Sequence, residues 1–186
     1  MKKGGVTLIE LLIAIALLAT MLIVITNVYV TGFKTFREEL ATSQLESNAQ
    51  TILDEITNTA KNAQSAEAAY DIYTSGPNSI ILKVPALDSN KNILYSNNTM
   101  LFDRVIYYYE DSKIHKLTLA EPTSIRYIEN GINKTIDDKI LELNFTYDPD
   151  AVSATLVTIN ISSHQEVGKI NRTISLTSKA RLRNHL

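Results

Sequence analysis

The chain contains no cysteine and no tryptophan among its 186 residues. Without cysteine it can form neither disulfides nor zinc–thiolate sites, and it has no thiol nucleophile. It has no strong excess of charge either, with 18 basic and 20 acidic residues and a formal net charge of −2. A weakly acidic chain gives no electrostatic reason to expect nucleic-acid binding. Its length suits one domain with an anchor.

Residues for metal binding or catalysis are also scarce. The three histidines are His115, expected in a strand, His164, expected in a turn, and His185 near the C-terminus. No two of them have the spacing of metal ligands. The acidic groups at 137–138 and 148–150 make calcium the weaker alternative, because they lack the full ligand pattern of a calcium loop. No phosphate-binding glycine loop and no nucleophile–base set is recognisable, so we predict no enzyme, no metal and no cofactor.

The N-terminal segment is basic, then glycine-rich, then apolar. Lys2 and Lys3 precede Gly4-Gly5, and residues 6–30 are mostly apolar. As a helix this segment would extend about 37 Å, enough to cross a hydrocarbon core of ~30 Å. One alternative is a secretory signal peptide cut near Ala14-Ile15-Ala16, although the apolar run continues past that point. Another is a plain signal anchor oriented by the two lysines.

Neither alternative explains Glu10. This residue lies four positions after Val6 and directly before the longest apolar stretch. A charge at the centre of a membrane helix costs ~2.5–3.5 kcal/mol on insertion scales, so such a residue is a functional candidate. A glutamate near the membrane surface that reaches the lipid headgroups is the structural alternative.

The run Gly4-Gly5-Val6-Thr7-Leu8-Ile9-Glu10 resembles the prepilin signature of type IV pilins and type II secretion pseudopilins. The resemblance implies that prepilin peptidase cleaves between Gly5 and Val6 and that the new amine of Val6 is methylated. It also implies that Glu10, the fifth residue of the mature chain, acts in assembly. Phenylalanine is more usual at the position of Val6.

The proposed cleavage gives Glu10 a physical partner. It creates an α-amine at Val6, whose reference pKa is near 8. The carboxylate of Glu10 can offset this cation within the same chain or in a neighbouring subunit. Pairing across subunits would lower the cost of both charges in the membrane and would favour assembly in one register.

The chain departs from major pilins at two places. No proline occurs before Pro77, whereas many major pilins have a helix-kinking proline near the membrane exit. The cysteine pair found near the C-terminus of many type IV pilins is also missing. Both departures favour a minor subunit.

An amphipathic helix is expected after the apolar segment. Apolar residues recur at helical spacing from Phe33 to Ala63, and the helix is predicted to continue to about Ala69. We expect this stripe to pack on the C-terminal domain. A coiled coil is the alternative, but the stripe lacks a clean heptad.

The C-terminal half shows the period of two that is typical of strands. Apolar and polar residues alternate at 80–84, 104–109, 141–147, 157–161 and 174–183. Turns are predicted at Glu110–Lys113 and Asp148–Asp150, and alternate tyrosines of Tyr107-Tyr108-Tyr109 are expected in the core. The pattern predicts a half-solvated antiparallel sheet. The fold class is therefore α+β and pilin-like, with a long N-terminal helix packed on a C-terminal antiparallel sheet domain.

Three further runs resemble minor pilins of the PilW type and the J-type minor pseudopilin. They are Ser79-Ile80-Ile81-Leu82, Ile106-Tyr107-Tyr108-Tyr109 and Arg181-Leu182-Arg183-Asn184. The resulting domain prediction is a leader peptide at 1–5, a transmembrane assembly helix at 6–30, an amphipathic extracytoplasmic helix and spacer at 31–75, and a sheet domain at 76–186.

The functional hypothesis is a non-catalytic minor pilin or pseudopilin. Its expected partners are prepilin peptidase, other pilin or pseudopilin subunits, the inner-membrane assembly platform and, before assembly, membrane lipid. It would first be a single-pass protein of the inner (cytoplasmic) membrane with an extracytoplasmic C-terminal domain, and then part of a type IV pilus or type II secretion pseudopilus. The rival hypothesis is a membrane-anchored extracytoplasmic binding module that does not polymerise.

Overall fold

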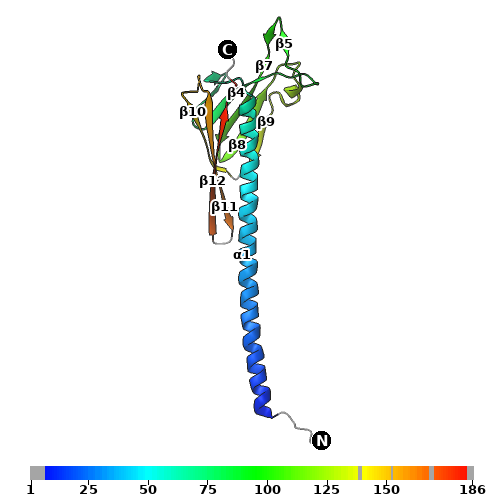
Figure 1. The fold of residues 1–186 in the computed structure, drawn as a ribbon, viewed down its shortest axis with the longest axis vertical. Helices are drawn as coiled ribbons and strands as arrows, with labels where there is room; N and C mark the ends of the chain where they lie inside the picture. Colours follow the sequence, from blue (N-terminus) through cyan, green and yellow to red (C-terminus); the bar gives the residue numbers. More distant parts are fainter. Residues whose placement is uncertain (1–6, 138–139, 152, 168–169, 184–186) are drawn as a thin grey trace. The chain divides into compact units, whose positions relative to one another are not determined.

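The structure is a computed structural model, and it describes residues 7–137, 140–151, 153–167 and 170–183. By their contacts the residues divide into two units, Met1–Ser43 and Gln44–Leu186. Figure 1 shows the elements. In chain order they are α1 (Leu8–Asn62), β1 (Ser65–Glu67), β2 (Ala69–Tyr70), β3 (Tyr73–Thr74), β4 (Ser79–Pro85), β5 (Tyr95–Ser96), β6 (Thr99–Met100), β7 (Phe102–Glu110), β8 (Lys113–Leu119), the 3₁₀ helix η1 (Ile125–Glu129), β9 (Asn133–Asp137), β10 (Ile140–Asp148), β11 (Leu156–Val167) and β12 (Ile170–Arg181).

The first part of α1 exposes apolar side chains on all sides. It contains a segment long and apolar enough to span a membrane, although a signal sequence near an N-terminus would have the same properties. Phe33, Phe36 and Leu40 are exposed as well. These three residues belong to the first unit, so the part of the predicted stripe that the structure places within the sheet domain begins at Leu45.

The last part of α1 is the amphipathic helix that the sequence predicts. Its buried residues follow the i, i+3, i+4 pattern of one helix face, and they are Leu45, Ala49, Ile52, Leu53, Ile56, Thr57 and Ala60. The helix ends at Asn62, not near Ala69. The reason is that Gln64 N donates to Lys83 O at 2.7 Å and the next residues pair with β4 as β1. Sheet pairing thus replaces the final helical turns.

The strands form two large antiparallel sheets that share one core. The order is β1-β4-β7-β8-β9 in the five-stranded sheet and β10-β11-β12 in the three-stranded sheet. Both contribute buried residues to the cluster that contains Ile52 and Ile56 of α1, among them Leu82, Tyr107 and Ile159. The structure therefore confirms the predicted α+β arrangement of helix on antiparallel sheet, and it confirms that Tyr107 is a core residue.

Both predicted turns are present. Glu110 pairs with Lys113, and Asp111 and Ser112 between them have φ of 51° and 62°. Two positive φ angles in a two-residue loop are those of a type I′ turn, whose twist suits a hairpin. Asp148-Pro149-Asp150 connects β10 to β11 and contains a cis peptide bond before proline.

The five-stranded sheet buries apolar residues on both faces. Away from the main core, Ile81, Ile106 and Leu117 form a second buried cluster, against which Tyr70 of β2 and Tyr73 of β3 pack. The prediction of one polar, solvated face is therefore wrong for β4 and β7. It is right for β12 from Thr173 onward, where exposed residues alternate with buried or half-buried ones to the end of the strand at Arg181.

Candidate processing and assembly site

Helix α1 starts with a capping box formed by Thr7 and Glu10. The Thr7 backbone N–H donates to Glu10 Oε2 at 2.9 Å, and the Thr7 hydroxyl donates to the same oxygen at 3.0 Å. In return, Glu10 N lies 3.4 Å from Thr7 Oγ1. This reciprocal pattern satisfies backbone N–H groups that the first helical turn leaves without partners. The sequence Thr-x-x-Glu at the start of an apolar helix is its known signature.

The capping box fixes where the carboxylate of Glu10 points. Its Oε2 is held over the N-terminal end of α1, where the helix dipole favours a negative charge. A carboxylate has about four lone-pair positions, and both hydrogen bonds from Thr7 use the same oxygen. Among the described residues none donates to Oε1, so this oxygen can accept a further donor. Glu10 is thus positioned to receive a cation one helical turn before it.

The cleavage residues Gly5 and Val6 lie outside the described residues, and their assignment stays a prediction. Sequence reasoning identified Glu10 but missed Thr7, which holds its side chain. The Thr7-x-x-Glu10 spacing was the signal that could have identified it.

The far end of the apolar segment has aromatic and basic side chains. The rings of Tyr29 and Phe33 stack with centroids 6.2 Å apart, and Arg37 Cζ lies 4.5 Å from the Phe33 centroid. Aromatic and basic residues are common where a helix leaves the hydrocarbon core. Residues 7–37 therefore combine a capped start, a membrane-length apolar segment and an end with aromatic and basic side chains.

The comparison with protein families bears on this same segment. Residues 1–26 match the prokaryotic N-terminal methylation motif. The match includes Gly5, Val6 and Glu10, and it supports a pilin or pseudopilin that prepilin peptidase processes. No curated protein and no solved structure matches the chain. The match does not extend into the sheet domain, so the resemblance to PilW-type pilins and the J-type pseudopilin belongs to the proposals below.

No second candidate centre emerges among the described histidines. His115 in β8 stacks on Tyr108 with centroids 4.9 Å apart. His164 lies within β11, opposite Thr173 of β12, so its predicted place in a turn is wrong. The hairpin of β11 and β12 continues past it, which keeps it in a strand. His185 lies outside the described residues. Within the described ranges no group of three or more His, Cys, Asp or Glu could hold a metal ion.

Proposed function

We propose that the chain is a minor pilin or pseudopilin, a structural subunit of a type IV pilus or a type II secretion pseudopilus. Prepilin peptidase would remove residues 1–5 and methylate the amine of Val6. The chain would wait in the cytoplasmic membrane with its C-terminal domain outside, and the assembly platform would then insert it into a filament. The observation that carries this proposal is the Thr7–Glu10 capping box inside the methylation motif, at the head of a membrane-length helix.

The assembly step follows from the charges at this end of the helix. A Val6 amine is a cation, and Glu10 is an anion whose Oε2 is already held by Thr7. The Oε1 atom is left to pair with an amine, either that of the same chain or that of a neighbour. An unpaired charge in the apolar layer costs ~2.5–3.5 kcal/mol, and pairing recovers part of it. Subunits in the register that pairs the two charges would therefore be favoured.

Two absences support a minor rather than a major subunit. Helix α1 has no proline at all, so it has no proline kink where the apolar segment ends. The chain also has no cysteine to staple its C-terminal strand. The last strand is held instead by twelve residue pairs between β11 and β12 and by Arg183 N, which donates to Ala63 O at 3.0 Å.

The first test is the mass of the mature N-terminus. The full-length chain is produced with prepilin peptidase, and its N-terminal peptide is identified by mass spectrometry. We expect a chain that begins at Val6 and has one added methyl group. An intact Met1 would support the anchored binding module, and cleavage near Ala16 would support a secretory signal peptide. Either result would contradict the proposal.

The second test separates anchoring from assembly. Glu10→Ala should leave the chain in the membrane but reduce its incorporation into sheared filaments about tenfold or more, which corresponds to losing roughly 1.4 kcal/mol of pairing. The matched control is Thr20→Ala, since the Thr20 hydroxyl only donates to Leu17 O within the same helix. Normal incorporation of Glu10→Ala would overturn the assembly role.

A further inference from the structure

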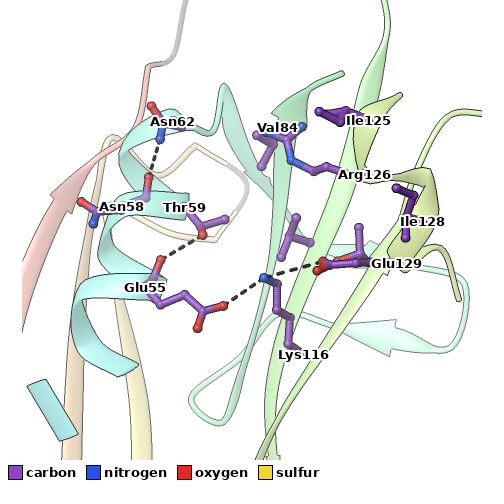
Figure 2. A pocket seen from close by; sticks show the side chains of 12 residues that line it. Glu55, Asn58, Thr59, Asn62, Val84, Lys116, Ile125, Arg126, Ile128 and Glu129 are labelled. Carbon is purple, nitrogen blue, oxygen red and sulfur yellow. Dashed lines mark hydrogen bonds and ion pairs between the residues drawn. The ribbon is translucent and has the colours of Figure 1, made fainter. Parts of the chain in front are cut away.

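A groove opens on the Gln44–Leu186 unit, between the last turns of α1 and the 3₁₀ helix η1 (Figure 2). Its volume is about 600 Å³. Val84 and Val105 of the five-stranded sheet contribute apolar surface to it, while α1 contributes polar side chains such as Asn58 and Asn62. The methylation motif lies outside this unit, so nothing in the processing site accounts for the groove.

The wall formed by η1 has two exposed isoleucines beside the charged Arg126 and Glu129. Ile128 is 85% exposed, and Ile125 beside it is also exposed, although both belong to an ordered element. Figure 2 shows them on the side of the groove opposite α1. Single exposed apolar residues are common, but Ile125 and Ile128 lie three residues apart and both line the groove. Exposed apolar residues that adjoin in this way are typical of contact surfaces.

An ion pair between the buried Asp103 and the partly exposed Arg126 holds η1 in place. The carboxylate of Asp103 on β7 is completely buried and accepts hydrogen bonds from Glu121 N, Ser124 Oγ and Arg126 Nη1 at 2.9, 2.6 and 2.8 Å. Arg126 also donates to Pro85 O at 2.9 Å. A buried pair of this kind is weak support for stability but fixes geometry. The isoleucines of η1 are therefore presented rigidly, which lowers the entropy lost when a partner binds them.

Two carboxylates, Glu55 and Glu129, and two cations, Lys116 and Arg126, line the groove, but only Lys116 is left to pair with the carboxylates. Lys116 Nζ lies 2.9 Å from Glu55 Oε1 and 4.0 Å from Glu129 Oε2. Lys116, whose side chain is only 21% exposed, therefore pairs mainly with Glu55. The side chain of Glu129 is 55% exposed and only weakly paired. The charge of Arg126 is already matched by Asp103. Glu129 is thus available to a cation from outside.

We propose that this groove docks a polypeptide segment of a different filament subunit. The segment would place an apolar side chain against Ile125 and Ile128 and a lysine or arginine beside Glu129. Charge complementarity selects a basic segment, and the exposed rim at Ile128 extends the contact beyond what a small molecule inside the groove would bury. This inference rests on the proposed function, since it concerns how the subunit recruits its neighbour.

The test is site-specific photocrosslinking in cells that assemble the filament. The full-length chain carries p-benzoylphenylalanine at position 128 or, as a matched control, at position 72, because Ile72 is similarly exposed at 80% on the β2–β3 hairpin. After irradiation the crosslinked peptide is sequenced by mass spectrometry. We expect an adduct from position 128 and not from 72, in a peptide of another prepilin-type protein that combines an apolar residue with a neighbouring lysine or arginine.

Charge reversal tests the role of Glu129. Glu129→Lys should lower the yield of the position-128 adduct about tenfold, because like charges would then meet in the groove. Glu46→Lys, an equally large change at an exposed position of α1, should leave the yield unchanged. An unchanged yield with Glu129→Lys would overturn the proposal. So would no adduct, equal adducts from both positions, or an adduct with a second copy of this chain, a lipid or a small molecule.

These outcomes can be separated from failure of the proposed function. If the mature chain begins at a methylated Val6 and Glu10→Ala blocks incorporation, but position 128 gives no adduct, only the groove inference fails. If the chain keeps Met1, both fail.

Discussion

Tyr107 on β7 and Thr59 on α1 meet inside the domain, with the phenol oxygen 3.0 Å from Thr59 Oγ1. The tyrosine is completely buried, and its oxygen also lies 3.4 Å from Glu55 Oε1. Thr59 in turn donates to Glu55 O at 2.9 Å. A buried tyrosine hydroxyl needs such a partner. This contact therefore sets the position of the last turns of α1 on the central strand of the five-stranded sheet.

The burial of Tyr107 makes stability depend on alkaline pH. Burial raises the pKa of the Tyr107 phenol well above its usual range, and it raises the pKa of Tyr147 too. Because the unfolded chain loses the phenol proton first, the contribution of Tyr107 is fully present below the ordinary tyrosine pKa of about 10 and is lost as the pH rises above it. We expect the free energy of unfolding to fall by about 1.4 kcal/mol per pH unit between roughly pH 10 and 12 on account of Tyr107.

Urea unfolding followed by far-UV circular dichroism, at a series of pH values in detergent, would measure this slope. Tyr107→Phe should reduce the slope of the free energy of unfolding by about 1.4 kcal/mol per pH unit. At neutral pH the same variant loses the hydrogen bond with Thr59. The control is Tyr95→Phe, whose ring is exposed and which should leave the slope unchanged. If Tyr107→Phe keeps the slope of the unchanged chain, the folded state does not raise the pKa of the Tyr107 phenol.

Removing the carboxylate of Asp103 should destabilise the domain strongly. Asp103→Ala leaves three donors without their acceptor, among them the guanidinium of Arg126. Breaking a buried ion pair on one side costs about 3–5 kcal/mol, and we expect a loss of this size. Ser124→Ala removes one of the three hydrogen bonds and should cost about 1–3 kcal/mol. Thermal unfolding of the full-length variants would measure both, and equal, small effects would contradict the network.

Two buried hydroxyls should be dispensable. Thr57 Oγ1 and Ser163 Oγ are buried and make no hydrogen bond. Replacing an unpartnered buried polar group by an apolar one of the same shape is neutral or stabilising, because its desolvation cost disappears. Thr57→Val and Ser163→Ala should therefore change the free energy of unfolding by between zero and about +2 kcal/mol. The control on the same helix is Thr59→Val, which loses the contact with Tyr107 and should destabilise.

The features that sequence predicted are those set by neighbouring residues. The spacing of Ile52 and Ile56 indicates the buried face of α1, and the alternation along β12 indicates its two faces. The turn at Glu110–Lys113 follows from small polar residues between two strands. These local rules carry no information about which elements cover each other.

What sequence could not predict depends on residues far apart in the chain. Ile81 and Ile106 break the alternation of their strands, but only the packing of Tyr70 and Tyr73 shows what covers them. A lone aspartate such as Asp103 is expected at the surface, and only the structure shows that it is buried and paired with Arg126. At the candidate site the reason differs: Glu10 was identified by its unusual charge, whereas Thr7 is an ordinary polar residue whose role appears only in the hydrogen bonds it makes.

Thr7 offers the most direct test of how Glu10 is positioned. Thr7→Val removes the hydroxyl that donates to Glu10 Oε2 and approaches Glu10 N, whereas Thr7→Ser keeps it. Loss of an N-cap hydroxyl costs about 0.5–2 kcal/mol, so amides in the first turn, such as that of Leu11, should exchange with solvent about 2- to 30-fold faster in micelles. Filament incorporation of Thr7→Val should fall between that of the unchanged chain and that of Glu10→Ala, because the backbone N–H still holds the carboxylate. If Thr7→Val and Thr7→Ser exchange and assemble alike, the hydroxyl does not position Glu10, and the Thr7 backbone N–H is sufficient to hold the carboxylate.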